Sequence, residues 1–255
     1  MTRRNRHSGE GRRGRTADRG RAQANVVGVA ILLGVTVLSL GALTASIGTV
    51  LESNAAAANA DRVAADMDAA LEPVAATGPG RGRISFTGGR LRTVERTVRV
   101  LDGSEVVATE RVGGLVFTSD RNRVAFVGGA IVRGTGSAAR MYADPPIAAS
   151  RGTLLVGVAR LNASGSDAVG GSAPTSVVLR TNVTHDRRAV GDGAYRVAVE
   201  TETPEPWEAY FARHNATVDR RDFDGDGVAS VVAAYPGNRT AYVVEHDMRV
   251  EVRRG

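Results

Sequence analysis

The chain of 255 residues has no cysteine and few aromatic side chains. The lack of cysteine excludes disulfide bonds, thiolate nucleophiles and metal sites built on thiolates. Aromatic residues make up 4% of the chain, whereas glycine occurs 31 times, so we expect a turn-rich fold built from small side chains.

Sequence signatures of catalysis are missing as well. His185, His214 and His246 show neither the HExxH pattern nor another paired spacing, and no Gly-x-Ser-x-Gly nucleophile motif occurs. The glycine pairs at 113–114 and 128–129 lack the spacing of a phosphate-binding loop. We therefore expect that the protein is not an enzyme and uses no cofactor apart from a candidate Ca²⁺ ion.

One long uncharged run, from Ala22 to Leu51, dominates the N-terminal part of the chain. A membrane-spanning helix needs about 20 mostly apolar residues, and a helix pairs its internal amides within itself. The run therefore predicts a single transmembrane helix over residues 23–51.

The charges on the two sides of this run differ. Residues 1–22 contain eight arginines against Glu10 and Asp18, so the net charge of +6 belongs to this basic leader and the rest of the chain is balanced. The segment after the run opens with acidic residues, Glu52 and Asp61 among them. The positive-inside rule then predicts a cytoplasmic N-terminus and an extracellular C-terminal part at the cell membrane. We interpret the basic leader as a topology signal and expect no nucleic-acid binding.

Three interpretations of the N-terminus compete: a cleaved secretory signal, an uncleaved signal anchor and a prepilin signal. A secretory signal has an apolar core of about 7–15 residues, so this run is about twice too long for one. The segment Arg21–Val29, RAQANVVGV, resembles the class III signal of archaeal type IV prepilins and flagellin-like proteins. The resemblance implies that a prepilin peptidase cuts between Ala22 and Gln23, or alternatively between Gly20 and Arg21. It also implies that the helix is retained as a filament core, as in haloarchaeal pilin-like surface proteins.

The helix is predicted to continue beyond the membrane. No proline interrupts residues 24–71, and alanines, which are strong helix formers, are frequent there. Such a helix is roughly 70 Å long, more than twice the ~30 Å of hydrocarbon. We therefore expect a helical stalk and linker over residues 52–77. Residues at helical spacing are expected to face the outer domain: Val63, Met67, Ala70 and Leu71.

Small residues recur along the predicted span. They are Ala30, Gly34, Gly41, Ala45 and Gly48. Small residues let helices approach closely in lipid, where packing drives association. The pattern predicts a helix that associates with copies of itself or with other pilins.

From residue 78 the pattern changes to short runs rich in Val, Ile and Thr with Gly, Asn and Asp between them, which is typical of strands and turns. We expect one strand over Leu91–Leu101, another over Ser176–Thr184, and a loop over Asn162–Pro174. One short helix is expected to be capped by Thr203 and to carry Trp207, Tyr210 and Phe211. The predicted fold class is α+β, with a long N-terminal helix and a β-sandwich-like extracellular head over residues 78–255.

The sharpest polar motif is Asp222-Phe223-Asp224-Gly225-Asp226-Gly227-Val228. Carboxylates at alternate positions, with glycine sixth, match the first half of an EF-hand loop, where alternate side chains supply oxygen ligands to Ca²⁺. We therefore predict a Ca²⁺ site at Asp222, Asp224 and Asp226. The twelfth position is Ala233, so a ligand from elsewhere, such as Glu245 or Asp247, is needed. The alternative is an Asp/Gly turn that joins two strands.

Four Asn-x-Ser/Thr sequons occur, at Asn162, Asn182, Asn215 and Asn238. All four lie in the part predicted to be outside the cell, which predicts surface positions and N-glycosylation.

The expected function is structural. The leader, the long helix and the β-rich head together predict a pilin-like cell-surface subunit of a type IV pilus-like assembly, in adhesion or surface attachment. The alternative is a single-span, membrane-anchored binding domain that does not polymerise.

Overall fold

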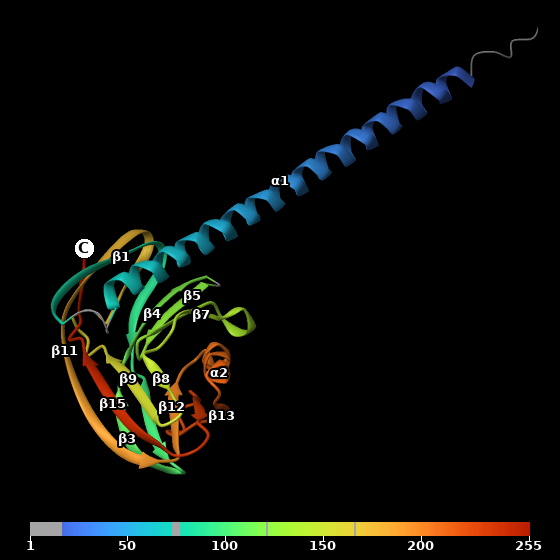
Figure 1. Cartoon of the computed structure of the whole chain (residues 1–255). Coiled ribbons are helices and arrows are strands. Elements are labelled where there is room, and N and C mark those ends of the chain that lie inside the picture. Colours follow the sequence, from blue (N-terminus) through green and yellow to red (C-terminus); the bar gives the residue numbers. More distant parts are fainter. Residues whose placement is uncertain (1–16, 73–76, 121, 166) are drawn as a thin grey trace, which may run out of the picture. The chain divides into compact units, whose positions relative to one another are not determined.

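The computed structural model describes residues 17–72, 77–120, 122–165 and 167–255, with the side chains from residue 28 onward. It divides into two compact units, one that ends at Asn54 and one over Ala55–Gly255. A long helix, α1 (Ala17–Leu71), runs through the boundary, and a mostly β head with a short helix, α2 (Pro204–Arg213), follows it (Figure 1). This confirms the predicted α+β class.

The part of α1 in the first unit is apolar and exposed. From residue 28 to residue 51 every side chain is exposed, and the most apolar window has a mean hydropathy of 2.1. Within the described part of the chain, α1 is the one helix long and apolar enough to cross a membrane, which fits a single-pass anchor. The hydroxyls of Thr36 and Thr44 donate to the carbonyls of Leu32 and Leu40 at 2.8 and 2.9 Å, so these polar groups are satisfied inside the helix.

The head contains two β-sheets. The larger has the order β7-β6-β5-β4-β1-β11-β15-β9-β8, with β16 pairing to β11 and β10 to β16, and the smaller has the order β13-β14-β12-β2-β3. The strands of the larger sheet are β1 (Gly78–Val94), β4 (Gly114–Ser119), β5 (Asn122–Val127), β6 (Ala130–Arg133), β7 (Arg140–Ala143), β8 (Ile147–Ala149), β9 (Thr153–Arg160), β10 (Ser164–Gly165), β11 (Ala168–Gly193), β15 (Arg239–Asp247) and β16 (Glu251–Arg254). The strands of the smaller sheet are β2 (Thr97–Asp102), β3 (Glu105–Arg111), β12 (Tyr195–Glu200), β13 (Thr217–Arg221) and β14 (Ser230–Ala234).

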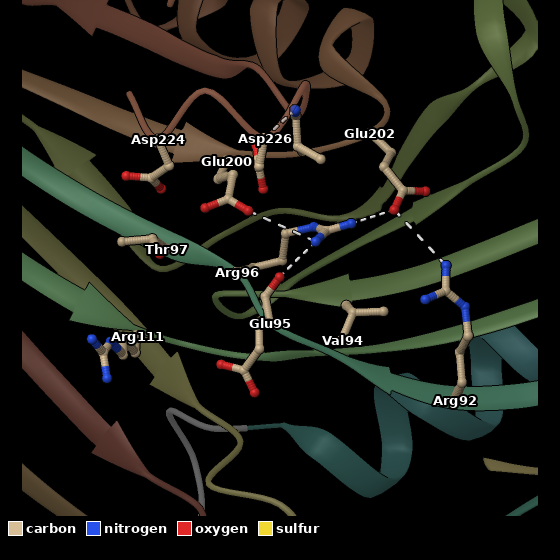
Figure 2. A pocket seen from close by; sticks show the side chains of 11 residues that line it. Arg92, Val94, Glu95, Arg96, Thr97, Arg111, Glu200, Glu202, Asp224 and Asp226 are labelled. Carbon is tan, nitrogen blue, oxygen red and sulfur yellow. Dashed lines mark hydrogen bonds and ion pairs between the residues drawn. The ribbon is translucent and has the colours of Figure 1, made fainter. Parts of the chain in front are cut away.

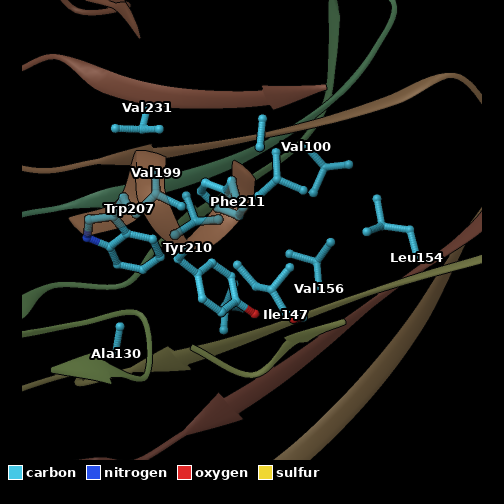
Figure 3. Close-up of a cluster of buried hydrophobic side chains, with 14 of the residues drawn as sticks. Val100, Ala130, Ile147, Leu154, Val156, Val199, Trp207, Tyr210, Phe211 and Val231 are labelled. Atoms are coloured by element: carbon cyan, nitrogen blue, oxygen red, sulfur yellow. Dashed lines mark hydrogen bonds between the residues drawn. The ribbon is translucent and has the colours of Figure 1, made fainter. Parts of the chain in front are cut away.

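One hydrophobic core lies between the two sheets, with α2 packed into it (Figure 3). Alternate residues of the strands point inward, as expected for a sheet with one buried face. Trp207, Tyr210 and Phe211 enter from α2, and each is at most 2% exposed. The aromatic side chains of α2 are thus part of the core. Thr203 stands at the N-cap but its side chain makes no capping bond; its amide instead donates to Thr201 Oγ1 at 3.1 Å.

A second core lies under the C-terminal end of α1. Ala60, Val63, Ala64, Met67 and Leu71 form one helix face, and each is at most 1% exposed. They pack against apolar side chains of the larger sheet, chiefly from β1, β4, β5 and β11. The predicted contact of this face with the head is confirmed. Because residues from Ala55 onward belong to the same compact unit as the head, most of the predicted stalk is an integral part of it. The linker residues 73–76 lie outside the described residues.

Three strand predictions are wrong, for one physical reason. The expected loop 162–174 contains β10, which pairs with β16, and the start of β11, where β1 pairs Arg90 with Gly170 and Gly89 with Gly171. The expected strand 91–101 is broken after Val94, since β1 and β2 join different sheets. β11 runs on to Gly193, because β15 takes over the pairing where β1 ends. Long-range partners, which local patterns do not reveal, set these boundaries.

Candidate functional site

The C-terminal part of α1 covers the edge of β1 that β11 leaves unpaired. Asn59 Oδ1 accepts the amide of Thr87 at 3.1 Å, and Asn59 Nδ2 donates to the Thr87 carbonyl at 3.1 Å. Asp66 Oδ2 accepts the amide of Ser85 at 2.9 Å. The helix side chains therefore replace a neighbouring strand and close an edge that would otherwise be open to another chain.

The other flank of the same helix segment is also held. Arg133, on β6, binds Asp61 Oδ1 at 2.5 Å and donates to the Ala57 carbonyl at 3.1 Å. We use the name helix latch for these two contacts of Arg133 together with the hydrogen bonds of Asn59 and Asp66 to β1. Between the two flanks, the face of α1 built on Val63 and Met67 is fully buried. The head is therefore joined to the helix by a core and by hydrogen bonds on both sides.

The small residues of the span remain open. A Cβ added at Gly34, Gly41 or Gly48 meets no heavy atom within 4 Å. These glycines recur every seven residues, so they form one face of the helix, to which Ala30 and Ala45 also belong. The structure thus places the predicted packing residues on an exposed, shallow strip.

The two expected cleavage positions lie in the first turns of α1. Gly20, Arg21, Ala22 and Gln23 are helical in backbone, and their side chains lie outside the described part of the chain. Most of the predicted leader, residues 1–16, is outside it too. Cleavage stays a prediction.

The acidic loop between β13 and β14 is a tightly hydrogen-bonded turn. The carboxylate of Asp222 accepts the amides of Asp224, Gly225 and Gly227 at 3.1, 2.8 and 3.1 Å. These bonds, led by the one from Gly225, lower the pKa of Asp222 below its usual range. Gly225 and Gly227 have φ of +70° and +84°, a conformation that favours glycine. The Asp/Gly spacing is therefore explained by the turn itself.

The other two acids of this loop also have partners. Asp224 binds Arg99 of β2 at 2.5 Å, and Asp226 accepts the amide of Val228 at 2.9 Å. The guanidinium carbons of Arg99 and Arg221 lie over the Phe223 ring, 4.9 and 4.6 Å from its centroid. The loop is thereby fixed on the outer face of the smaller sheet.

The structure does not bring the suggested extra Ca²⁺ ligands to this loop. Glu245 and Asp247 lie on β15 in the larger sheet, where Glu245 pairs with Arg160 and Asp247 with Arg249. The carboxylates that line a hollow together with Asp224 and Asp226 are instead those of Glu95, Glu200 and Glu202. Among the described residues no group of three or more His, Asp or Glu is placed to hold a metal ion. Ca²⁺ binding stays a prediction for the loop alone.

A charged hollow of about 390 Å³ lies beside this loop (Figure 2). At its centre the buried Arg96 binds Glu202, and its Nη1 lies 3.7 Å from Glu200. Glu202 also pairs with Arg123 at 3.1 Å and with Arg92 at 3.8 Å. The acids and arginines largely neutralise one another, and the described lining contains no histidine, serine or cysteine. The hollow offers charged groups of both signs to a polar ligand.

The histidines serve structural contacts. His185 and His246, paired across β11 and β15, have their Nδ1 atoms 2.7 Å apart. His214 Nδ1 lies 2.8 Å from the Tyr210 carbonyl at the end of α2. His7 lies outside the described residues.

The four sequon asparagines, Asn162, Asn182, Asn215 and Asn238, are all exposed. This confirms their surface position. Occupation by glycans stays a prediction.

Sequence reasoning missed the residues that join the elements of the head. Asn59 and Asp66 look like ordinary polar positions of a helix, and Arg96 and Glu202 like solvated charges near strand ends. Each gains its role from a partner far away in the sequence, 28 residues for Asn59 and 106 for Arg96. For Asn59 and Asp66, the one signal in the sequence is that each stands next to an apolar residue that is buried in the core.

In the comparison with protein families, the chain matches a family described as a family of unknown function (DUF7289) over residues 21–251. The match includes the apolar helix and nearly the whole head. Neither the curated proteins nor the solved structures contain a match to the chain.

Proposed function

The chain belongs to the DUF7289 family, and we propose that it is a pilin-like structural subunit of a type IV pilus-like assembly at the cell surface. The observation that carries this proposal is the continuity of α1. Residues 28–51 of α1 are uncharged, mostly apolar and exposed, and residues 60–71 supply one face to the core of the head, without a break in the helix. A subunit whose helix packs in a filament core and whose head forms the surface requires such a connection.

The helix latch supports this role over simple anchoring. A receptor that only presents its head needs a tether, and a flexible linker suffices for that. Here the helix is locked by the buried Val63 and Met67 and by Asn59, Asp66 and Arg133. A pull on this part of α1 would thus reach the head through packed residues, as a filament under tension requires.

The arrangement in the membrane is part of the proposal. The arginine-rich leader remains cytoplasmic, the helix crosses the membrane, and the head is outside, where it serves adhesion or surface attachment. A prepilin peptidase removes the leader before Gln23 or before Arg21. The family match supports a common unit of helix and head, because it begins at Arg21 and continues through both.

The alternative function is a single-span anchored binding domain. The charged hollow around Arg96 and Glu200 favours it, since it offers both signs of charge to a polar ligand. In that case the helix serves as an anchor only, and association between helices is not needed.

Substitution of two of the exposed glycines of α1 separates the two functions. We expect Gly41→Leu/Gly48→Leu to abolish surface filaments, because leucine side chains keep the helices apart. The matched control is Ser39→Leu/Ser46→Leu, which makes the same kind of change at the same spacing on the opposite face. Electron microscopy of whole cells and of sheared filaments is the measurement. Filaments in the control but not in the glycine variant support the pilin function, and heads displayed normally without filaments in any strain support the anchored domain.

A further inference from the structure

The C-terminal part of α1 separates two surfaces of opposite charge. Successive helix residues are about 100° apart, so Asn59 and Asp66 lie on one flank, where they contact β1. Asp61 and Asp68 lie on the opposite flank, where Arg133 of β6 binds Asp61.

The first surface, which we call the basic surface, consists of Arg81 and Arg83 of β1 and Arg180 of β11. The strand register places Arg81 directly opposite Arg180, and both point away from the face on which Gly82 contacts Ala70. All three arginines are exposed. Within the described part of the chain, no carboxylate forms an ion pair with any of them.

The neighbouring strand does not neutralise the basic surface. Glu251 of β16 stands opposite Arg180, but its carboxylate is bound by Arg253, whose Nε is 2.7 Å away. Like charges placed directly opposite each other destabilise a sheet. The stability of the fold therefore does not explain why two arginines stand opposite each other here. Binding of an acidic partner explains it.

The second surface, which we call the acidic groove, lies on the other flank of α1. It is a hollow of about 210 Å³, rimmed by Asp68 and Glu72 of the α1 end and by Asp144. Its floor is apolar and consists of Leu71, Phe126, Ile131, Ala143 and Pro146. Asp144 lies 3.7 Å from Arg213, and Asp68 and Glu72 are exposed. An arginine fits such a groove well, since its aliphatic stem packs on the floor while its guanidinium binds the rim.

We propose that the basic surface of one copy binds the acidic groove of the next copy. Because the two surfaces are different, and Arg81 and Arg180 point away from the sheet face that α1 covers, each bound pair leaves one free surface at either end. A contact of this kind is heterologous and repeats in an open line or helix instead of closing as a dimer. The proposal rests on the proposed function and adds to it: the heads bind one another directly, outside the helical core of the filament.

Charge reversal in the full-length chain tests this contact. Arg81→Glu/Arg180→Glu and Asp68→Arg/Glu72→Arg each place like charges together, so each is expected to raise the concentration needed for assembly at least about tenfold. The chain that carries all four substitutions restores opposite charges and is expected to assemble again. The matched control, Arg151→Glu/Arg196→Glu, reverses two exposed arginines elsewhere on the head and is expected to assemble like the wild type. Thermal unfolding of each variant shows whether it is folded.

Cysteine cross-linking gives a second readout without changing the charges, and the chain has no native cysteine to interfere. Ala65 is exposed beside the acidic groove, and Asn182 is exposed two residues from Arg180 on the same face of β11. Under mild oxidation, a chain with both Ala65→Cys and Asn182→Cys is expected to form a ladder of dimers, trimers and longer species. Neither single-cysteine variant forms the ladder.

The outcomes separate this contact from the proposed function. A wild-type chain that never self-associates contradicts both. Assembly that the glycine variant Gly41→Leu/Gly48→Leu abolishes, but that folded charge-reversed variants leave unchanged, overturns the contact between heads alone. Loss in both reversed pairs with recovery in the fourfold variant, together with the disulfide ladder, establishes it.

Discussion

Gly82 shows how one residue sets the approach of the head to α1. A Cβ built at Gly82 lies 2.2 Å from the Cβ and 2.8 Å from the Cα of Ala70, so even alanine must push the helix and β1 apart. Glycine here is a packing requirement, and it is invisible in the sequence because Ala70 is reached only in the folded head.

We predict that Gly82→Ala lowers the free energy of unfolding by about 1–3 kcal/mol, the usual cost of overpacking. Gly171→Ala is the matched control, since Gly171 lies on the partner strand β11 and a Cβ there meets nothing within 4 Å. Denaturant unfolding of the two variants compares them. Equal stabilities would contradict the close approach between Gly82 and Ala70.

The His185–His246 pair is the titratable contact of the larger sheet. Burial, and then the neighbouring His185, lower the pKa of His246 below its ordinary value of 6.5. A histidine whose pKa is lower in the folded state binds its proton more readily after unfolding. Its contribution to stability is therefore present above pH 6.5 and is lost as the pH falls through the pKa of the folded state.

We accordingly predict that the free energy of unfolding decreases as the pH is lowered from about 6.5, and that His246→Gln weakens this slope. His214→Gln, at the end of α2, serves as the control and keeps the slope. Chemical denaturation at a series of pH values measures it. An unchanged slope in the His246 variant would show that other groups cause the pH dependence.

The acidic loop illustrates what the sequence reveals about a site at this scale. Alternating Asp and Gly indicate a turn, and the structure has one, with Asp222 bound to the loop amides. The partner that fixes its place, Arg99, lies on β2, 125 residues before Asp224 in the chain. The local sequence pattern therefore predicts the turn, but not the strand residues that it contacts.

At the scale of elements, the helix latch closes the open edge of β1. The amides of Ser85 and Thr87 are bonded to side chains of α1 instead of to another strand. Without those side chains, the two amides would hydrogen-bond to water or to another chain. An unpaired strand edge of this kind is a site of aggregation.

We predict that Asn59→Ala/Asp66→Ala destabilises the head by about 1–3 kcal/mol in total and speeds hydrogen exchange at Ser85 and Thr87 relative to the amides of β4. Asn54→Ala/Asp68→Ala changes the same residue types on the helix away from this edge and provides the control. Hydrogen exchange followed by NMR or mass spectrometry resolves the affected segment. Unchanged protection of residues 85–87 would rule out the latch as the partner of this edge.

The elements differ in how far the sequence predicts them. The face of α1 with Val63, Met67 and Leu71 follows from helical spacing, and α2 follows from its proline and its aromatic spacing. The boundaries of β1, β2 and β11 do not follow from local pattern, because each depends on which strand lies beside it. The glycine-rich start of β11 is extended only because β1 pairs with it.

At the scale of the whole molecule, the exposed apolar part of α1, residues 28–51, requires lipid or other protein around it. Leu38 and Val37 are 74% and 69% exposed, which water alone does not tolerate along a whole helix. Lipid would satisfy this need for an anchored chain, and neighbouring helices would satisfy it in the proposed filament. The composition of the sequence indicates this need, whereas the basic surface and the acidic groove that we propose to join the heads emerge only from the folded sheet.

The N-terminal residue of the mature protein tests the central claim most directly. The full chain is expressed in a haloarchaeal host with and without its prepilin peptidase, extracted from membranes, and sequenced from its N-terminus by mass spectrometry. The pilin function predicts a start at Gln23, or at Arg21, only where the peptidase is present. A start at Met1 or Thr2 in both strains, or beyond Ala45, would contradict it.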